Sequence, residues 1–364
     1  MPSSGPTDDG KLGSLMGNKP FKGFKSQPAP PSKRVVQSLL DVMKDGNEYA
    51  SLLDVFPEHM NVVNEIRRGM ADVEQIRKRP LLVYAANVLY SKGDVPTGIV
   101  SADDLPFAEM VAQVDAGDTA VDVLVVTPGG VAQQVAQFVN RLRPRFDHVA
   151  YVVPHVAMSA GTIWVLSGDQ IWMDERGSLG PIDPQVPGRD GRFLPAQALL
   201  SLIESIRVRG EERLKNGANP AWTDQMLLRN MDAKEIGDAH SFSMYSIQLA
   251  ANYLENYKFR SWVTHQSGNA VTADQRKRRA AEITTKLCDR SQWKVHSHGI
   301  SRDVLWNELQ LKIDHPEQED GFLRALRRFW ALMYWVFDNA TVVKMFLSQN
   351  YSVVRNVPQP GGLK

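Results

Sequence analysis

The sequence predicts an α/β fold built around a largely parallel sheet, on three observations. The chain has 364 residues, of which 43% are hydrophobic, as is ordinary for a soluble globular protein with one large domain or two modest ones. Between residues 81 and 174, short apolar strand patterns alternate with helix patterns. The connections are short, and such alternation requires right-handed crossovers that leave successive strands parallel.

The chain before this core is predicted to hold a tail and a helical extension. Residues 1–34 are polar and rich in glycine, proline, serine and lysine, so we expect a disordered tail without the apolar run of a secretory signal. Residues 35–79 carry charged helical patterns such as "MNVVNEIRRGMADVEQIRK". Pro80 ends this extension because proline cannot continue a helix.

The core is predicted over residues 80–190. Its strands are short runs rich in valine and other apolar residues. In the helix after the second strand, the side chains of Val131, Val135 and Phe138 fall on one face. The predicted elements are strands at 81–89, 120–130, 148–154 and 169–174, with helices at 101–114, 131–142 and 160–168.

Residues 191–350 are predicted as a helical region that completes the site and the oligomer interface. The stretch "FWALMYWVF" at 329–337 is the most apolar of the chain, but it is about half as long as a bilayer span requires. We therefore expect no membrane span, and we expect this helix to lie in or near the interface of a homo-oligomer. Helices are predicted at 195–215, 241–263, 272–290 and 321–347, followed by a flexible tail at 351–364.

The composition argues against several functional classes. The net charge of +1 gives no general attraction to nucleic acid or anionic membranes. With Cys288 as the single cysteine, no intrachain disulfide can form, which predicts a reducing compartment and a cytoplasmic location. His296 and His298 are two residues apart without the further ligands of a zinc site, so no metal is expected. No glycine-rich phosphate loop is present, so no nucleotide cofactor is expected.

Two loops that follow strands of the predicted sheet carry the chemistry. Open α/β sheets place their ligand sites at such loops. The first is "TPGG" at 127–130, where adjacent glycines permit unusual backbone angles and a close approach of the backbone to a ligand. The second is "MSAGT", in which Ser159 ends a strand and Ala160 begins a helix. The loops are separated by one helix and one strand, so we expect them to be neighbours at one sheet edge.

Together these loops offer the groups that acyl transfer requires. The Ser159 hydroxyl lies at the electropositive start of a helix, and the Ala160 N–H can point at an oxyanion that forms on a substrate carbonyl. The glycine turn offers further backbone donors to the same point. A third stretch, "GSLGPIDPQ" at 177–185, is predicted as a rigid loop over the same edge.

These three stretches, in this order and at this spacing, resemble those of the serine dehydrogenase proteinase family. That family lies in the Clp-protease-like branch of the crotonase-type fold, and "WKVHSHGIS" at 293–301 also looks similar. The resemblance covers roughly residues 80–350. It implies a ClpP/crotonase-like parallel sheet with helices on both faces, plus helical N-terminal and C-terminal extensions. It also implies Ser159 as the nucleophile, with N–H groups of Gly129 or Gly130 and of Ala160 in the oxyanion hole.

The resemblance leaves the general base open. Clp proteases have a histidine in the loop that corresponds to "SLGPIDPQ", whereas this chain has Asp183 there. Signal peptide peptidases of the same fold use a lysine instead, and Lys215 is the first lysine after Ser159. His298 is a titratable group flanked by small residues, and it is ranked first. Asp183 could act as the base or orient it, and His155 is a further candidate.

The sequence thus predicts a cytoplasmic serine endopeptidase that cuts a peptide or protein substrate through an acyl-enzyme on Ser159. Two alternatives stay open. The first is a scaffold or peptide-binding assembly protein of the same fold whose site has lost its base. The second is a crotonase-type enzyme that uses the same backbone donors to polarise an acyl-CoA thioester, although such an enzyme needs no serine nucleophile at "MSAGT".

Overall fold

The structure is a computed structural model that describes residues 34–57, 61–90, 95–187, 193–265, 267–293 and 295–357. Its centre is a six-stranded sheet with the order β12 (Tyr351–Asn356), β11 (Val342–Ser348), β3, β4, β5 and β7. The four strands β3 (Leu81–Ala86), β4 (Ala120–Val126), β5 (His148–Val153) and β7 (Gln170–Met173) are parallel to one another. This arrangement confirms the predicted α/β fold with a largely parallel sheet.

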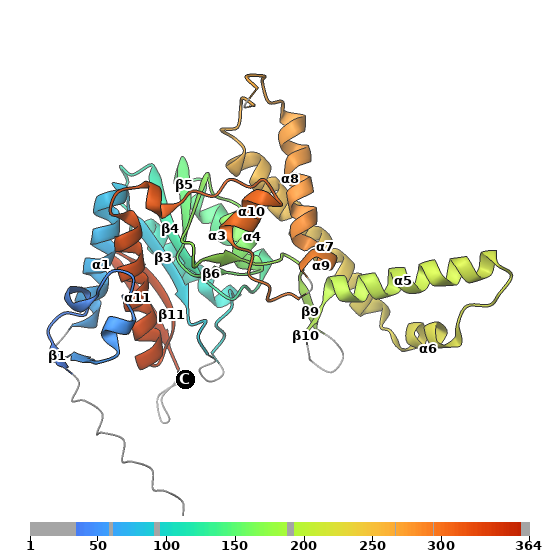
Figure 1. Cartoon of the computed structure of the whole chain (residues 1–364), viewed down its shortest axis with the longest axis horizontal. Coiled ribbons are helices and arrows are strands. Elements are labelled where there is room, and N and C mark those ends of the chain that lie inside the picture. Colours follow the sequence, from blue (N-terminus) through green and yellow to red (C-terminus); the bar gives the residue numbers. More distant parts are fainter. Residues whose placement is uncertain are drawn as a thin grey trace, which may run out of the picture.

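Helices cover both faces of this sheet (Figure 1). Alternate side chains of a strand point to opposite faces, so each strand contributes to two apolar clusters. Val83 packs in the cluster that contains Phe329, whereas Tyr84 packs with Phe138. One face is covered by α1 (Val62–Arg77) and α11 (Phe322–Asn339), and the other by α2 (Asp104–Ala112), α3 (Ala132–Leu142) and α4 (Ala160–Val165).

The helical region after the core extends away from the sheet. Helices α5 (Ala196–Lys215) and α6 (Trp222–Asn230) form an arm that projects from the body (Figure 1). Helix α7 (Ala233–Tyr253) returns to the body, where it contacts α4 and α8 (Ala273–Cys288). It continues into a π-helical turn, Leu254–Lys258. Two short helices follow, α9 (Arg290–Trp293) and α10 (Arg302–Asn307).

The described residues also contain three small two-stranded sheets. β1 (Arg34–Val36) pairs with β2 (Val55–Pro57), and β9 (Gln185–Pro187) pairs with β10 (Phe193–Pro195). The pair of β6 (Val156–Ala157) and β8 (Ser178–Leu179) is parallel and lies directly before the predicted nucleophile. This pair ties the "MSAGT" turn to the "GSLGPIDPQ" loop.

The helix predicted at 321–347 is wrong after Asn339. α11 ends at Asn339, and residues 342–348 form β11, which pairs antiparallel with β3. Thr341, Val342 and Val343 are β-branched, which favours a strand where the backbone can join a sheet. The predicted flexible tail is wrong for Tyr351–Asn356, which forms β12 as a hairpin partner of β11.

Three further expectations concern the parts of the chain outside the core. In the predicted helical extension, a regular helix begins only at Val62, where the Asn61 side chain accepts hydrogen bonds from the N–H groups of Val63 and Asn64. The predicted disordered tail at 1–34 lies outside the described residues except for Arg34. The apolar face of α11 is buried within the chain, because Phe329 and Phe337 pack against α1 and the sheet rather than being left for another subunit.

Candidate active site

Ser159 lies at the point where β6 turns into α4. Its backbone angles are φ 51° and ψ −115°, in the region that favours glycine. A serine in such a conformation is strained, and strained residues are concentrated at functional sites. The turn presents the hydroxyl at the amino-terminal end of the helix, as in the sharp nucleophile turns of α/β-hydrolases.

The "TPGG" loop lies directly against this turn. The Thr127 N–H donates to the Val156 carbonyl at 2.9 Å, and the Met158 N–H donates to the Thr127 carbonyl at 3.0 Å. The prediction that the two loops are neighbours at one sheet edge is therefore confirmed. Gly130 has a φ of 140°, and a Cβ there would lie 2.3 Å from the Ile99 carbonyl oxygen, so no other residue fits.

The predicted oxyanion donors differ in what their N–H groups contact. The Gly129 N–H donates to the Thr127 hydroxyl at 3.2 Å. Among the described residues, the N–H groups of Gly130 and Ala160 have no acceptor. The Ala160 N–H belongs to the first turn of α4, where backbone donors have no partner within the helix. Gly130 and Ala160 are therefore the two donors that remain for a substrate oxygen.

A short segment around Ile99 holds the glycine turn in place. The Ile99 N–H donates to the Gly129 carbonyl at 2.7 Å, and the Val131 N–H donates to the Ile99 carbonyl at 2.9 Å. Beneath this segment, the buried Lys344 ammonium of β11 donates to the Gly98 carbonyl at 2.5 Å and pairs with Asp103 at 2.7 Å. Strand β11 thus supports the backbone that carries the candidate oxyanion donors.

The structure pairs a histidine of the cavity that Ser159 lines with an aspartate. His296 Nδ1 lies 2.8 Å from Asp183 Oδ1, and the side chains are 19% and 4% exposed. A carboxylate accepts hydrogen bonds, so it holds the proton on Nδ1 and leaves the lone pair of Nε2 for another partner. His296 and Ser159 line the same cavity of about 760 Å³, together with Gly130 and Ala160.

Backbone contacts fix the position of this pair. Ile300 exchanges hydrogen bonds with Leu179 of β8, at 2.7 and 3.1 Å, which holds the segment of His296 against the loop that carries Asp183. The Ile182 N–H donates to the Leu287 carbonyl of α8 at 3.0 Å. Two segments more than 100 residues apart therefore meet at the Ser159 cavity.

The other predicted base candidates lie elsewhere. His298 is exposed, and its ring centroid lies 5.6 Å from that of Trp293. His298 is not among the described residues that line the cavity. Lys215 is exposed at the far end of α5, on the projecting arm. His155 stacks on Trp330 at 5.5 Å in a different cavity, where burial lowers the pKa of its imidazole.

Sequence reasoning missed His296 because its side chain and that of His298 look equivalent in "VHSHG". A turn in which the His298 N–H donates to the Val295 carbonyl at 3.2 Å separates the two rings. One signal in the sequence was Asp183, a carboxylate in a loop that has no histidine of its own. Such a carboxylate could have pointed to a histidine from another segment.

The lining of the cavity also includes apolar and aromatic side chains, which are Ile163 of α4, Ile182, and Phe242 and Tyr245 of α7. The described residues contain no group of three or more histidine, cysteine, aspartate or glutamate side chains that could hold a metal ion. No helix within the described part of the chain is long and apolar enough to cross a membrane.

Residues 109–211, which include Ser159 and Asp183, match the family of ClpP-like SDH-type serine proteinases. This match confirms the resemblance to that family predicted from the sequence. The family and the observed fold together support a peptidase.

The chain is also similar to two uncharacterized proteins of Methanocaldococcus jannaschii. One is 31% identical over 34% of this chain and 38% of its own length, and the other is 26% identical over 44% of this chain and 54% of its own length. The chain therefore spans about half or less of each relative it matches. A solved structure of a membrane-bound stomatin-specific protease with a substrate peptide is 24% identical over 32% of this chain and 56% of its own, with a TM-score of 0.25. At that score the likeness says nothing about the activity of this chain.

Proposed function

We propose that the chain is a serine endopeptidase in which Ser159 is the nucleophile, His296 the general base and Asp183 the group that orients His296. The observation that carries the proposal is the 2.8 Å contact between His296 Nδ1 and Asp183 at the edge of the Ser159 cavity. In this proposal His296 takes the place of His298 and Lys215 as the base, since neither of those residues lines that cavity. The N–H groups of Gly130 and Ala160 serve as the oxyanion hole.

The reaction follows from these groups. As Ser159 Oγ bonds to the substrate carbonyl carbon, His296 Nε2 accepts the hydroxyl proton and the carbonyl oxygen gains a negative charge. The Gly130 and Ala160 N–H groups donate to that oxygen. The Asp183 carboxylate stabilises the imidazolium, which then gives its proton to the leaving amine. A water molecule, deprotonated by the same imidazole, releases the acyl group and restores Ser159.

The cavity wall suggests the substrate class. Ile163, Ile182 and Phe242 surround the site with apolar surface, which favours a peptide or protein substrate with an apolar side chain beside the scissile bond. The scaffold alternative rested on the lack of a histidine base, and His296 supplies one. The acyl-CoA alternative uses only the backbone donors and gives no role to Ser159 or to the His296–Asp183 pair. The cytoplasmic location stays a prediction.

A fluorophosphonate probe tests the proposal, because it labels only a serine that a base has activated. We expect labelling of the wild-type protein at Ser159 and none in Ser159→Ala, which removes one hydroxyl from a helix start and leaves the fold intact. Folding is checked by circular dichroism and the melting temperature. A correctly folded wild-type protein that is not labelled would favour the scaffold alternative, and labelling that persists in Ser159→Ala would rule out this nucleophile.

A further inference from the structure

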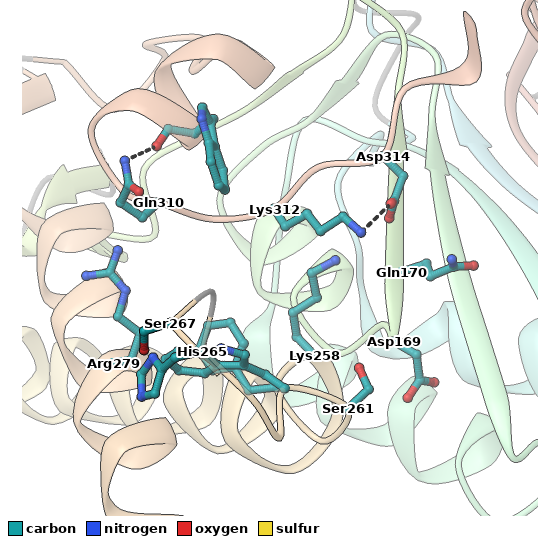
Figure 2. A pocket seen from close by; sticks show the side chains of 13 residues that line it. Asp169, Gln170, Lys258, Ser261, His265, Ser267, Arg279, Gln310, Lys312 and Asp314 are labelled. Atoms are coloured by element: carbon teal, nitrogen blue, oxygen red, sulfur yellow. Dashed lines mark hydrogen bonds and ion pairs between the residues drawn. The ribbon is translucent and has the colours of Figure 1, made fainter. Parts of the chain in front are cut away.

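A second cavity of about 800 Å³ lies beside β7, at the other end of the helical region. Among the described residues it shares no lining residue with the Ser159 cavity. Its walls come from the start of β7, the end of the π-helical turn Leu254–Lys258, α8, and the segment after α10 (Figure 2). A cavity of this size is large enough for a small organic ligand.

Lys258 is the unusual residue of this cavity. Its side chain stands inside the cavity (Figure 2), the residue is 8% exposed, and its ammonium has no hydrogen-bond or ion-pair partner among the described residues. Burying an unpaired charge is costly, so most buried lysines are paired. Short π-helical segments such as the one that ends at Lys258 occur frequently at functional sites.

The groups around Lys258 leave a surplus of positive charge. The ammonium of Lys312 repels that of Lys258, and Asp314 and Asp169 attract it. Asp314 is already 3.6 Å from the Lys312 ammonium. Asp169 is held by the guanidinium groups of two arginines outside the cavity lining, Arg143 at 2.7 Å and Arg260 at 2.8 Å. An anion between the two lysines would relieve their repulsion.

The remaining lining adds aromatic surface. Arg279 of α8 and His265 also line the cavity (Figure 2), and the Arg279 guanidinium is already paired with Glu282 at 2.9 Å, so the two lysines remain the groups for an anion. Three aromatic residues, Phe259, Trp262 and Trp306, provide apolar surface, and Trp306 is 47% exposed. An exposed tryptophan beside a cationic cavity is suited to a flat ring that carries an anionic group.

We propose that this cavity binds a small molecule with a phosphate monoester and a flat ring, that is, a mononucleotide-like ligand. The phosphate lies between Lys258 and Lys312, and the ring lies against Trp262 and Trp306. A phosphate monoester carries a charge of about −1.5 to −2 near pH 7, which matches two ammonium groups better than the single charge of a carboxylate. The proposal does not depend on the peptidase activity.

Isothermal titration calorimetry with adenosine monophosphate as the probe tests this site. We expect adenosine monophosphate to bind at least about tenfold more tightly than either adenosine or inorganic phosphate. Lys258→Met should weaken its binding at least about tenfold, since a charge-assisted hydrogen bond is worth about 1.5–3 kcal/mol and 1.4 kcal/mol corresponds to tenfold. Lys312→Met should weaken it as well. The matched control is Lys234→Met, which removes an exposed lysine of α7 that is paired with Asp238.

The dependence on pH gives a second readout. Burial lowers the pKa of Lys258 to about 8. In the free protein Lys258 therefore loses its proton as the pH rises from 7 to 9, while the phosphate stays dianionic, so the affinity of the wild-type protein should fall over this range. In Lys258→Met the affinity should be low and less dependent on pH. The melting temperature of this variant should not fall, because it removes an unpaired buried charge.

Three results would overturn the proposal. They are no binding of adenosine monophosphate by the wild-type protein, equal affinity in folded Lys258→Met, and binding of adenosine as tight as that of adenosine monophosphate. Inorganic phosphate bound as tightly as adenosine monophosphate would overturn the part of the proposal that concerns the ring.

Discussion

Substitution of His296 by asparagine should abolish peptidase activity, whereas the same substitution of His298 should not. His296→Asn removes the imidazole but keeps an N–H donor close to the position of Nδ1, so the 2.8 Å contact with Asp183 can be retained. His298→Asn is the matched control, because it changes the same residue type in the same segment. His298 is exposed and packs on Trp293.

The expected magnitudes follow from these surroundings. Loss of a general base typically costs about 10²- to 10⁴-fold in rate, which corresponds to about 3–5 kcal/mol of transition-state free energy. The free energy of unfolding should change little in His296→Asn, because the buried Asp183 carboxylate keeps a donor. His298→Asn should lose at most about 1.5 kcal/mol of stability with its ring contact and should keep its activity within about twofold.

The assay is hydrolysis of a fluorogenic peptide library with apolar residues before the scissile bond, together with fluorophosphonate labelling of both variants. The melting temperature of each variant separates a chemical loss from unfolding. If His298→Asn lost activity and a correctly folded His296→Asn kept it, the assignment of His296 as the base would be wrong. The ranking of His298 first would then be restored.

Three other predictions concern the surroundings of the site. Gly130→Ala should lower the rate of probe labelling at least about tenfold, because the added Cβ would lie 2.3 Å from the Ile99 carbonyl oxygen. The control Gly117→Ala should leave labelling unchanged, because a Cβ added there meets no atom within 4 Å. Lys344→Met should destabilise the protein in thermal or urea unfolding, but by less than the about 3–5 kcal/mol that a fully unpaired buried charge costs, since Asp103 loses its closest cation and keeps Arg355 at 3.3 Å. We also expect a homo-oligomer joined through the exposed apolar side chains of the α5–α6 arm, where Trp222 is 72% exposed. Light scattering should give the wild-type protein a mass that is a multiple of 40.7 kDa, and a lower mass for Trp222→Glu. A mass of one chain for the wild-type protein at micromolar concentration would contradict this.

The order and type of the core elements could be predicted from the sequence because they depend on local patterns. The apolar runs that became β3, β4, β5 and β7 are bounded by breakers, and the helix after "TPGG" has a clear apolar face. The two chemistry-bearing loops could be found in the same way. Each follows a strand, and parallel strands deliver their carboxyl ends to one edge.

The sequence could not decide features that depend on contacts between distant segments. Residues 342–348 have strand propensity, but they also continue an apolar helical pattern, and only the free edge of β3 makes the strand more favourable. Likewise, α11 was expected to need another subunit, and only the packing of α1 against it removed that need.

The candidate base was decided in the same way. Ser159 and Ala160 are adjacent in sequence, so their relation at a helix start is local and could be predicted. His296 and Asp183 are 113 residues apart, and the pairing of Ile300 with Leu179 sets which histidine ring meets the carboxylate. The turn that carries Ser159 and the resemblance to the serine proteinase family could be predicted from the sequence by itself, because both reside in short motifs. Only the tertiary structure favours His296 over His298 as the candidate base, because that choice depends on a single turn and on the position of a loop from elsewhere in the chain.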